Sequence, residues 1–500
     1  EPSGNLIWVP CYDNFTCANL EVPLDYEHLS AGYTNVAFIK HEGSDPSAED
    51  IIFNPGGPGG SGVNYIRKGY NSLRNKKPGI GWEYNLISFD PRGVKNSGPN
   101  LDCFGKNKIA KALYHSSFSS FSGTRMSAAV SVGSKYLPPG FAQVEALGKF
   151  CSEVHKNGDA GHAGTVAVAQ DLMHFIQVRA ASRGRPAAQA ALNFYGGSYG
   201  TVIGSTFAAL YPDRVRRMIL DGVVDAPGWY KGTNWGDLRQ VDECVQSFFN
   251  TCYAAGLKCA LNKGAKSPAD IQARFDAVLK DIEAYPIPVF DPRLVSMPVV
   301  IEIDHVLSLV FAALYSPLQR FPFLAEIFEA LERRDGTEFV KSQKFGKLSL
   351  MQGPPLFRSL SLSPPKSQIF DGKPFLDDSG QVRCRYLTNV GSKFAQPINT
   401  STPILFLTNA LDPITPSATE MSSIFTDSIV LTANATGHCM TDSKCSRGYV
   451  KKYLATGQLP PKNAMCEVEQ IPFLSKIEAQ RFIAWYVMDG DDEEHSLLWL

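Results

Sequence analysis

The chain has 500 residues, of which 44% are hydrophobic and 19% charged, and its formal net charge is −1. This near-neutral balance argues against nucleic acid or an anionic membrane as a partner, and no apolar run reaches the ~18–20 residues that a membrane span requires. The length exceeds that of one ordinary domain. It predicts a large domain with a substantial insertion, or two domains.

The first part of the chain, residues 1–225, alternates strand-like and helix-like segments. Helical patterns are present at 165–179 and 201–211, and short apolar runs predict strands at 35–39, 51–53, 85–90, 191–195 and 216–221. Strands that alternate with helices indicate a mainly parallel sheet with helices on both faces.

The character of the sequence changes at about residue 226. Up to residue 395, helical patterns such as 271–284 and 323–334 are broken by stretches rich in proline and glycine, which predicts an inserted, mainly helical cap. Strand-type residues then return at 403–408 and 428–431, and a helix at 476–488 would close the fold. Residues 396–500 are therefore expected to complete the sheet-bearing core.

A candidate serine nucleophile lies at residues 196–200, whose sequence is Gly-Gly-Ser-Tyr-Gly. The pattern Gly-x-Ser-x-Gly is weak by itself, because a glycine-rich chain of this length can match it by chance. Here it stands between a predicted strand and a predicted helix, which is the setting of a nucleophile elbow. We therefore expect Ser198 at a sharp strand-to-helix turn.

A serine nucleophile needs a base, and the base needs an acid that orients it. Asp412 and His438 each follow a predicted strand by a short loop, where open α/β sheets place their sites. An aspartate before proline is usually a turn former, and a Gly-His pair is usually part of a loop. The chain order Ser198, Asp412, His438 is that of the α/β-hydrolases, and it favours a catalytic triad.

A glycine-rich loop at residues 53–62, Phe-Asn-Pro-Gly-Gly-Pro-Gly-Gly-Ser-Gly, follows an early predicted strand. Glycines let backbone N–H groups turn toward a developing oxyanion, and we expect Gly57 and Tyr199 to supply this pair of donors. A phosphate-binding loop is disfavoured, because its lysine motif is absent and two prolines remove donors. A purely structural turn stays open.

Other polar residues have simpler interpretations. Asp90 and Arg92 end a predicted strand, and a buried ion pair that shapes the floor of the site is the favoured interpretation. Asp304 is expected to cap the N-terminus of a cap helix.

The eleven cysteines lack a zinc-type Cys-x-x-Cys spacing and favour disulfides in an oxidising compartment. We interpret the start at Glu1, without methionine, as that of a mature or trimmed product from which any signal peptide has been removed. Three glycosylation sequons, at Asn14, Asn399 and Asn434, permit secretion without arguing for it. Buried reduced cysteines of a cytosolic protein are the alternative. Plausible local pairs are Cys11/Cys17, Cys103/Cys151, Cys252/Cys259 and Cys445/Cys466, and the candidates for a free thiol are Cys244, Cys384 and Cys439.

Taken together, these motifs resemble the tripeptidyl aminopeptidase branch of the α/β-hydrolases, which is related to the prolyl aminopeptidases. The segments that carry the resemblance are 17–26, 54–62, 89–93, 196–200, 220–225, 411–416, 437–439 and 445–466. The resemblance implies a secreted serine exopeptidase that removes short peptides or single residues from a free N-terminus and needs no cofactor. It also implies Ser198 as nucleophile, His438 as base and Asp412 as the orienting acid.

One departure from that branch concerns the cap. An Ala-Ile-x-Cys-x-Asp stretch that many members carry is absent, and residues 351–365 form a segment rich in proline and serine instead. This leaves open the partner of Cys384 and the recognition of the substrate amine. An esterase or lipase-like hydrolase of a non-peptide acyl substrate is the second interpretation. A binding protein on a hydrolase scaffold is the third, and it is disfavoured because no catalytic position is lost.

Overall fold

The computed structural model describes residues 2–76, 78–105, 107–111, 113–114, 137–156, 158–231, 239–342 and 390–474. The predicted helix at 476–488, the segment 351–365 and Cys384 lie outside these residues.

A ten-stranded sheet forms the centre of the described part of the chain, in the order β1-β2-β3-β5-β4-β6-β7-β10-β11-β12. The first strands pair antiparallel, and all pairs from β5 to β12 are parallel, which confirms the predicted mainly parallel sheet. The strands are β1 (Val9–Cys11), β2 (Phe15–Pro23), β3 (Tyr33–His41), β4 (Glu49–Asn54), β5 (Tyr84–Phe89), β6 (Leu192–Gly197), β7 (Val215–Asp221), β10 (Leu405–Leu411), β11 (Ile429–Thr436) and β12 (Met465–Cys466).

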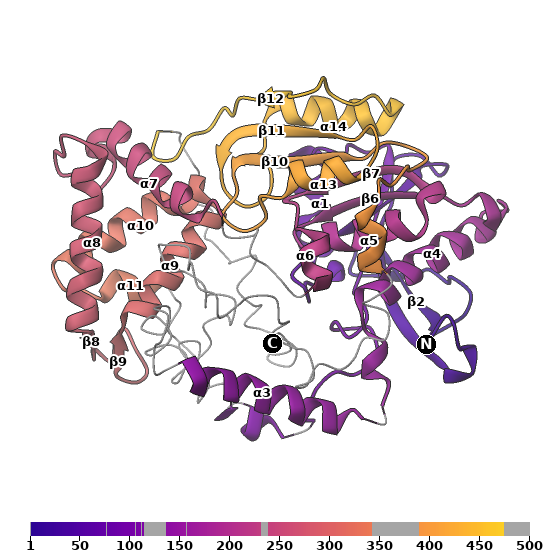
Figure 1. Cartoon of the computed structure of the whole chain (residues 1–500), viewed down its shortest axis with the longest axis horizontal. Coiled ribbons are helices and arrows are strands. Elements are labelled where there is room, and N and C mark those ends of the chain that lie inside the picture. The colour runs from indigo at the N-terminus through magenta and orange to yellow at the C-terminus, as the bar shows by residue number, and fades with distance from the viewer. Residues whose placement is uncertain are drawn as a thin grey trace.

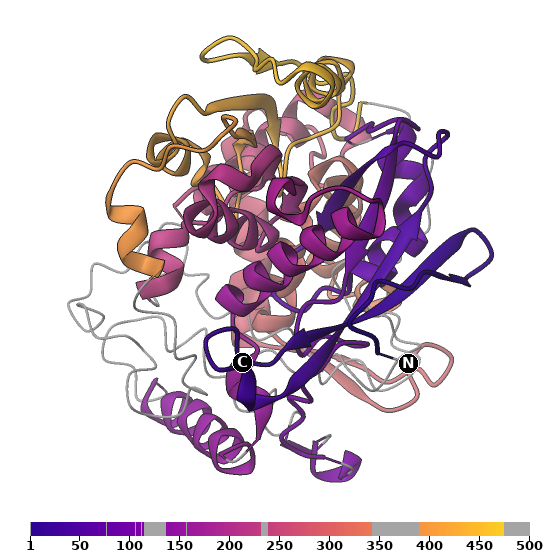
Figure 2. The ribbon, with the colours of Figure 1, turned by 90° about the vertical axis from the view of Figure 1, so that its right-hand side faces the viewer.

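Helices cover both faces of the sheet. One hydrophobic cluster joins the sheet to α4 (Thr165–Ser182), α5 (Gly200–Leu210), α6 (Ala226–Lys231) and α13 (Ala418–Ile424). A second cluster on the other face joins it to α1 (Gly62–Asn75) and α14 (Lys444–Thr456). Figure 2 shows the magenta helices α4 and α5 packed together, with the long indigo N-terminal strands at one edge of the molecule.

The central strands read as continuous apolar runs because both of their faces are buried. In β4, Ile52 belongs to the first cluster, whereas its neighbours Ile51 and Phe53 belong to the second. This alternation follows from the period of two of a strand, in which successive side chains point to opposite faces.

The cap has a hydrophobic cluster of its own, which Figure 1 shows as a group of pink and salmon helices beside the sheet. Its elements are α7 (Val241–Ala255), α8 (Pro268–Ala284), β8 (Ile287–Val289), β9 (Val299–Ile301), α9 (Ile303–Tyr315), α10 (Pro317–Glu332) and α11 (Thr337–Ser342). A capping box of Ser267 and Asp270 starts α8. Helix α3 (Leu137–Val154) lies at the bottom of the same view.

The expected helix cap at Asp304 is wrong by two residues. Helix α9 begins at Ile303, so Glu302 is its N-cap and accepts a hydrogen bond from the backbone of His305. The Glu302 N–H donates in return to Nδ1 of His305 at 3.1 Å. This reciprocal pair satisfies the backbone N–H groups of Glu302 and His305. The carboxylate of Asp304, the second residue of the helix, could not satisfy both.

The expected pair of Asp90 and Arg92 is also not formed. Arg92 instead binds both carboxylate oxygens of Asp171 on α4, at 2.7 and 2.8 Å. Asp90 accepts from the Ser61 hydroxyl at 2.6 Å and from the Val63 N–H at 3.1 Å. The two side chains therefore reach different helices: Asp90 fixes the start of α1, and Arg92 holds α4.

All four predicted disulfides are present, namely Cys11–Cys17, Cys103–Cys151, Cys252–Cys259 and Cys445–Cys466. Among the described residues Cys244 and Cys439 are free thiols. The three sequon asparagines are exposed. Within the described ranges, no helix combines the length and the hydropathy of a membrane span.

Candidate active site

The predicted elbow is a sharp turn between β6 and α5. Ser198 stands between them with a φ of 53°, in the left-handed region that a residue with a side chain rarely adopts. Its N–H donates to the backbone oxygen of Asp221 at 2.9 Å, and the residue is buried. Such a strained turn presents a serine hydroxyl at the top of a parallel sheet.

Glycines make this turn possible. A Cβ on Gly196 would lie 2.6 Å from the carbonyl carbon of Gly200, and a Cβ on Gly200 would lie 2.5 Å from the backbone oxygen of Asn54. Real Cβ atoms do not approach so closely, because the atoms would overlap. Strand, helix and the neighbouring β4 can therefore meet at Ser198 only when these positions carry no side chain.

The structure brings Asp412 and His438 together. Asp412 directly follows β10, and His438 lies in the loop after β11. Nδ1 of His438 is 3.3 Å from Oδ1 of Asp412, and both side chains are buried. Nδ1 is also 3.1 Å from the hydroxyl of Thr415, which donates to Oδ2 of Asp412 at 3.0 Å. Because that hydroxyl proton goes to Asp412, Nδ1 carries the ring proton and Nε2 is the basic nitrogen.

Backbone donors hold the Asp412 carboxylate. The N–H groups of Ile414 and Thr415 reach Oδ1 at 2.9 Å each, and the Cys439 N–H reaches Oδ2 at 3.2 Å. The Asp412 N–H in turn donates to Oε1 of Gln240 at 3.0 Å, which ties the acid loop to the chain just before α7. These contacts fix the plane of the carboxylate opposite the imidazole.

Charge and burial act against each other in this pair. Burial raises the pKa of Asp412, but the His438 charge, its hydrogen bond and the two backbone donors outweigh it, so the pKa lies below its ordinary value. Burial lowers the pKa of His438, but the charges and hydrogen bonds of Cys439 and Asp412 hold it well above its ordinary value. The pair is therefore an ionised carboxylate beside a strongly basic imidazole.

The glycine-rich loop after β4 lies against the elbow. A Cβ on Gly56 would be 2.8 Å from the Tyr199 nitrogen and 2.9 Å from Cβ of Ser198. Gly56 and Gly57 have φ values of 91° and 121°, which favour glycine. The arrangement brings the loop backbone to the nucleophile, where the predicted donors Gly57 and Tyr199 would act. Their role as an oxyanion hole stays a prediction.

Sequence reasoning missed two polar groups of this site. Thr415 was visible only as part of the motif Asp-Pro-Ile-Thr, in which a threonine three residues after the acid is a readable signal. Gln240 carries no comparable signal, because it lies 172 residues from Asp412 in the chain.

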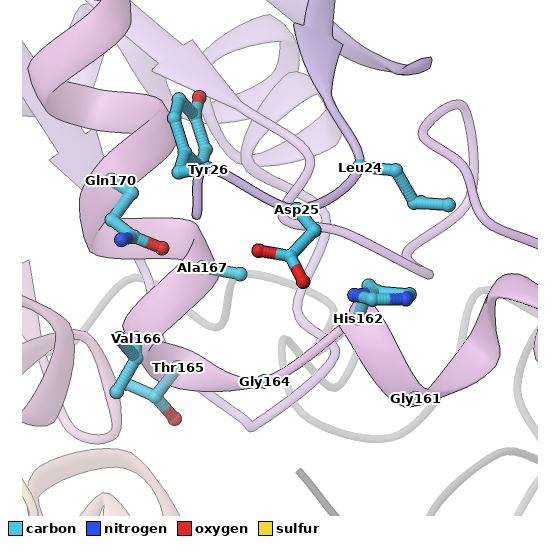
Figure 3. A pocket seen from close by; sticks show the side chains of 10 residues that line it. All are labelled: Leu24, Asp25, Tyr26, Gly161, His162, Gly164, Thr165, Val166, Ala167 and Gln170. Atoms are coloured by element: carbon cyan, nitrogen blue, oxygen red, sulfur yellow. The ribbon is translucent and has the colours of Figure 1, made fainter. Parts of the chain in front are cut away.

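A cavity of about 20 Å³ lies beside the start of α4 (Figure 3). It is lined by Leu24, Asp25, Tyr26, Gly161, His162, Gly164, Thr165, Val166, Ala167 and Gln170. A volume of this size admits about one water molecule, so a peptide does not fit there. Its wall residue Thr165 contacts the Tyr199 hydroxyl at 2.7 Å, which links the cavity to the elbow. Among the described residues, no three His, Cys, Asp or Glu side chains are arranged to hold a metal ion.

Two known protein families match parts of this chain. The family described as alpha/beta hydrolase fold matches residues 51–251, and the family described as TAP-like protein matches residues 378–466. The chain has the α/β-hydrolase fold, with a TAP-like segment at residues 378–466. The two matches contain Ser198 on one side and Asp412 and His438 on the other.

Curated relatives match parts of this chain. Serine protease Hip1 of Mycobacterium tuberculosis is 32% identical over 277 residues, which are 53% of this chain and 46% of that protein. Tripeptidyl aminopeptidase of Streptomyces lividans is 29% identical over 225 residues, 43% of this chain and 37% of that protein. The chain thus matches less than half the length of these relatives. Among solved structures, an epoxide hydrolase from an endophytic Streptomyces has 12% identity and a TM-score of 0.34, over 91% of this chain and 98% of that one.

Proposed function

We propose that the chain is a secreted serine hydrolase with the triad Ser198, His438 and Asp412, and that it releases short peptides or single residues from a free N-terminus. The observation that carries the proposal is the buried pair of His438 and Asp412 at 3.3 Å, in the loop beside a strained serine elbow. The peptide as substrate rests on the relatives, which are named as a serine protease and as a tripeptidyl aminopeptidase.

The proposed mechanism passes through an acyl-enzyme. Nε2 of His438 takes the proton of the Ser198 hydroxyl, whose oxygen attacks the scissile carbonyl carbon. His438, now an imidazolium, is stabilised by Asp412 and protonates the leaving amine. Water then attacks the acyl-enzyme, with His438 again taking the proton, and Ser198 is restored with release of the acid product.

The oxyanion of each tetrahedral intermediate would accept from the backbone N–H groups of Gly57 and Tyr199. Support comes from the left-handed glycines of the loop and from its contact with the elbow. The N-terminus of α5 adds to this effect, because the partial positive charge of a helix start stabilises a nearby anion.

Ester hydrolysis is the second candidate function. Carboxylesterase B of Mycobacterium tuberculosis is 32% identical over 87 residues, which are 17% of this chain and 16% of that protein. The same triad serves both amide and ester carbonyls, so the substrate is decided by the surroundings of the site rather than by Ser198.

Secretion is supported by four disulfides, since such bonds persist in oxidising compartments. The exposed sequon asparagines are compatible with this location.

The test uses three kinds of reporter: a tripeptide with a free N-terminus, the same peptide with a blocked N-terminus, and p-nitrophenyl esters. We expect cleavage of the free peptide only, and loss of turnover and of fluorophosphonate labelling in Ser198→Ala. Cleavage of esters only would establish the second candidate. Turnover near that of the wild type in Ser198→Ala would show that the triad assignment is wrong.

A further inference from the structure

Asn409 on β10 makes hydrogen bonds to the backbone on both sides of the candidate base, His438. Its side chain is buried, and its Nδ2 donates to the backbone oxygens of Gly437 and Cys439 at 2.7 Å each. Its Oδ1 accepts from the Thr441 N–H at 2.8 Å. Both amide protons and one lone pair of Asn409 thus make hydrogen bonds to residues 437–441, the histidine loop, on either side of His438.

Asp221 at the end of β7 holds the same loop from the next strand. Oδ1 of its buried carboxylate accepts from the Met440 N–H at 2.6 Å, and Oδ2 accepts from the Tyr195 hydroxyl at 2.5 Å. The backbone oxygen of Asp221 accepts from the Ser198 N–H at 2.9 Å. One residue therefore contacts both the nucleophile elbow and the histidine loop.

The strands that carry these residues are neighbours in the sheet. β7 and β10 pair in parallel, with Asp221 opposite Leu407, and the Gly222 N–H donates to the Leu407 oxygen at 3.1 Å. Because the central sheet is well packed on both faces, the two strand ends form a rigid base for residues 437–441.

The histidine loop needs such support, because its backbone is strained. Cys439 has a φ of 62°, in the left-handed region that a cysteine rarely adopts, and the φ of Gly437 is 138°. A strained conformation of this kind costs about 1–3 kcal/mol and persists only where surrounding contacts fix it. The hydrogen bonds to residues 437, 439, 440 and 441 supply those contacts.

We propose that Asn409 and Asp221 are positioning residues that fix the His438 imidazole relative to Ser198. This inference rests on the proposed triad and assigns to it two residues beyond the nucleophile, the base and the acid. Asn409 acts through the carbonyl groups that flank His438. Asp221 acts by joining the histidine loop to the elbow, so that a shift of one is transmitted to the other.

The test compares Asn409→Ala and Asn409→Asp with the matched control Asn193→Ala. Asn193 is also a buried asparagine of a central strand, but it donates to the Asp50 backbone oxygen at 3.0 Å, near the other end of the strand. Asn409→Asp keeps the size and the acceptor for Thr441 but loses both donors.

We expect both Asn409 variants to lose about 100-fold in kcat, with KM within about threefold of wild type, because a misplacement of the base of about 1 Å costs that much. Asn193→Ala should lower the melting temperature and leave kcat within about twofold. A kcat for both Asn409 variants equal to that of Asn193→Ala would overturn the inference.

A second readout does not depend on activity. The imidazole ¹⁵N and ¹H signals of His438 should show a slowly exchanging Nδ1 proton in the wild type and lose it in Asn409→Asp; an unchanged signal would also overturn the inference. If the Asn409 variants do not fold, the nearly isosteric variant Asp221→Asn is measured instead. Its kcat and its Nδ1 proton signal then test the inference. A wild-type protein that neither turns over a reporter nor reacts with a fluorophosphonate would instead refute the proposed function. The imidazole signals would still test whether Asn409 and Asp221 position His438.

Discussion

At the scale of single residues, the site combines strain with charge. Ser198 and Cys439 both adopt left-handed backbone conformations, one at the elbow and one next to His438 in the chain. Asp412 is fully buried, yet the His438 charge, its hydrogen bond and the backbone N–H groups of Ile414 and Thr415 hold the pKa of its carboxyl below the ordinary value. The pair with His438 is thus set by hydrogen bonds that the neighbouring loops supply.

The substitution Asp412→Asn should lower kcat by about 10³–10⁴-fold. An amide in this position presents an N–H to the ring, favours the wrong tautomer of His438 and gives no charge to stabilise the imidazolium. Steady-state kinetics on the free tripeptide reporter measures the effect, with melting temperature as the control for folding. A loss below about tenfold would show that Asp412 is not the orienting acid.

The pH profile follows from the raised pKa of His438. Below that pKa the imidazole is protonated and cannot act as base, so kcat/KM should rise with pH, with a midpoint above the ordinary histidine value of about 6.5. In Asp412→Asn the contributions of Cys439 and of burial remain while the carboxylate charge and its hydrogen bond are gone, so the midpoint of the residual activity should move to lower pH. A midpoint that moves upward would contradict this account.

The free energy of unfolding depends on the ionisation of the same two groups. It falls with rising pH where His438 titrates and rises with pH where Asp412 titrates. The raised pKa of His438 adds stability that is fully present below the unfolded value of about 6.5 and is lost as the pH rises through the folded pKa. The lowered pKa of Asp412 adds stability that is present above the unfolded value of about 3.9 and is lost as the pH falls through its folded pKa.

At the scale of elements, glycines decide how closely loops and helices approach. The Gly56 loop, the end of β6 and the start of α5 meet within van der Waals distance because Gly56 and Gly200 have no side chain. The same contact explains how residues from β4 and β6, far apart in the sequence, can face one reaction centre.

Gly56→Ala should therefore damage the site more than an ordinary glycine substitution. The new Cβ would lie 2.8 Å from the Tyr199 nitrogen, so the loop must move away from the elbow. We expect a loss of about 1–3 kcal/mol in the free energy of unfolding and a loss of at least tenfold in kcat.

The matched control is Gly184→Ala, at a left-handed position with a φ of 68° and no atom within 4 Å of the added Cβ. It reports the cost of backbone strain alone and should leave kcat unchanged. Equal kinetics in the two variants would show that the Gly56 loop does not line the site.

Local patterns predicted the elements better than their contacts. The strand segments around Ile52 and Phe194 were readable because burial on both faces demands a continuous apolar run. The elbow was readable because a sharp turn needs glycines at fixed positions, whereas the triad stays a prediction. Two other contacts depend on how helices and strands pack, and no local signal encodes that packing. They are the pairing of Arg92 with Asp171, 79 residues away, and the hydrogen bonds of Asn409 to the histidine loop.

At the scale of the whole molecule, the parallel sheet gathers the site from five strands. The carboxyl ends of β4, β6, β7, β10 and β11 lie at one edge, and each is followed by a loop that supplies part of the candidate machinery. The cap adds a separate hydrophobic core, to which Leu411 and Ile414 beside the acid also pack.

The disulfides should contribute unequally to stability. Cys103–Cys151 spans 48 residues and Cys11–Cys17 only 6. Replacement of the first pair by serines should cost roughly 4 kcal/mol and of the second roughly 2 kcal/mol, because the longer loop restricts the unfolded chain more. Denaturant unfolding of the two double variants measures the difference, and equal midpoints would argue against this entropic account.

The contact between the cap and the candidate base His438 would affect the order of events in the proposed catalytic cycle. The His438 N–H donates to the backbone oxygen of Tyr315, the last residue of α9, at 3.1 Å, and the two rings meet edge to face with centroids 5.0 Å apart. Any movement of this helix end that widened the path to Ser198 would also release the main chain of the base. Substrate entry through such an opening and proton transfer would then exclude each other in time, so that an open molecule would be inactive.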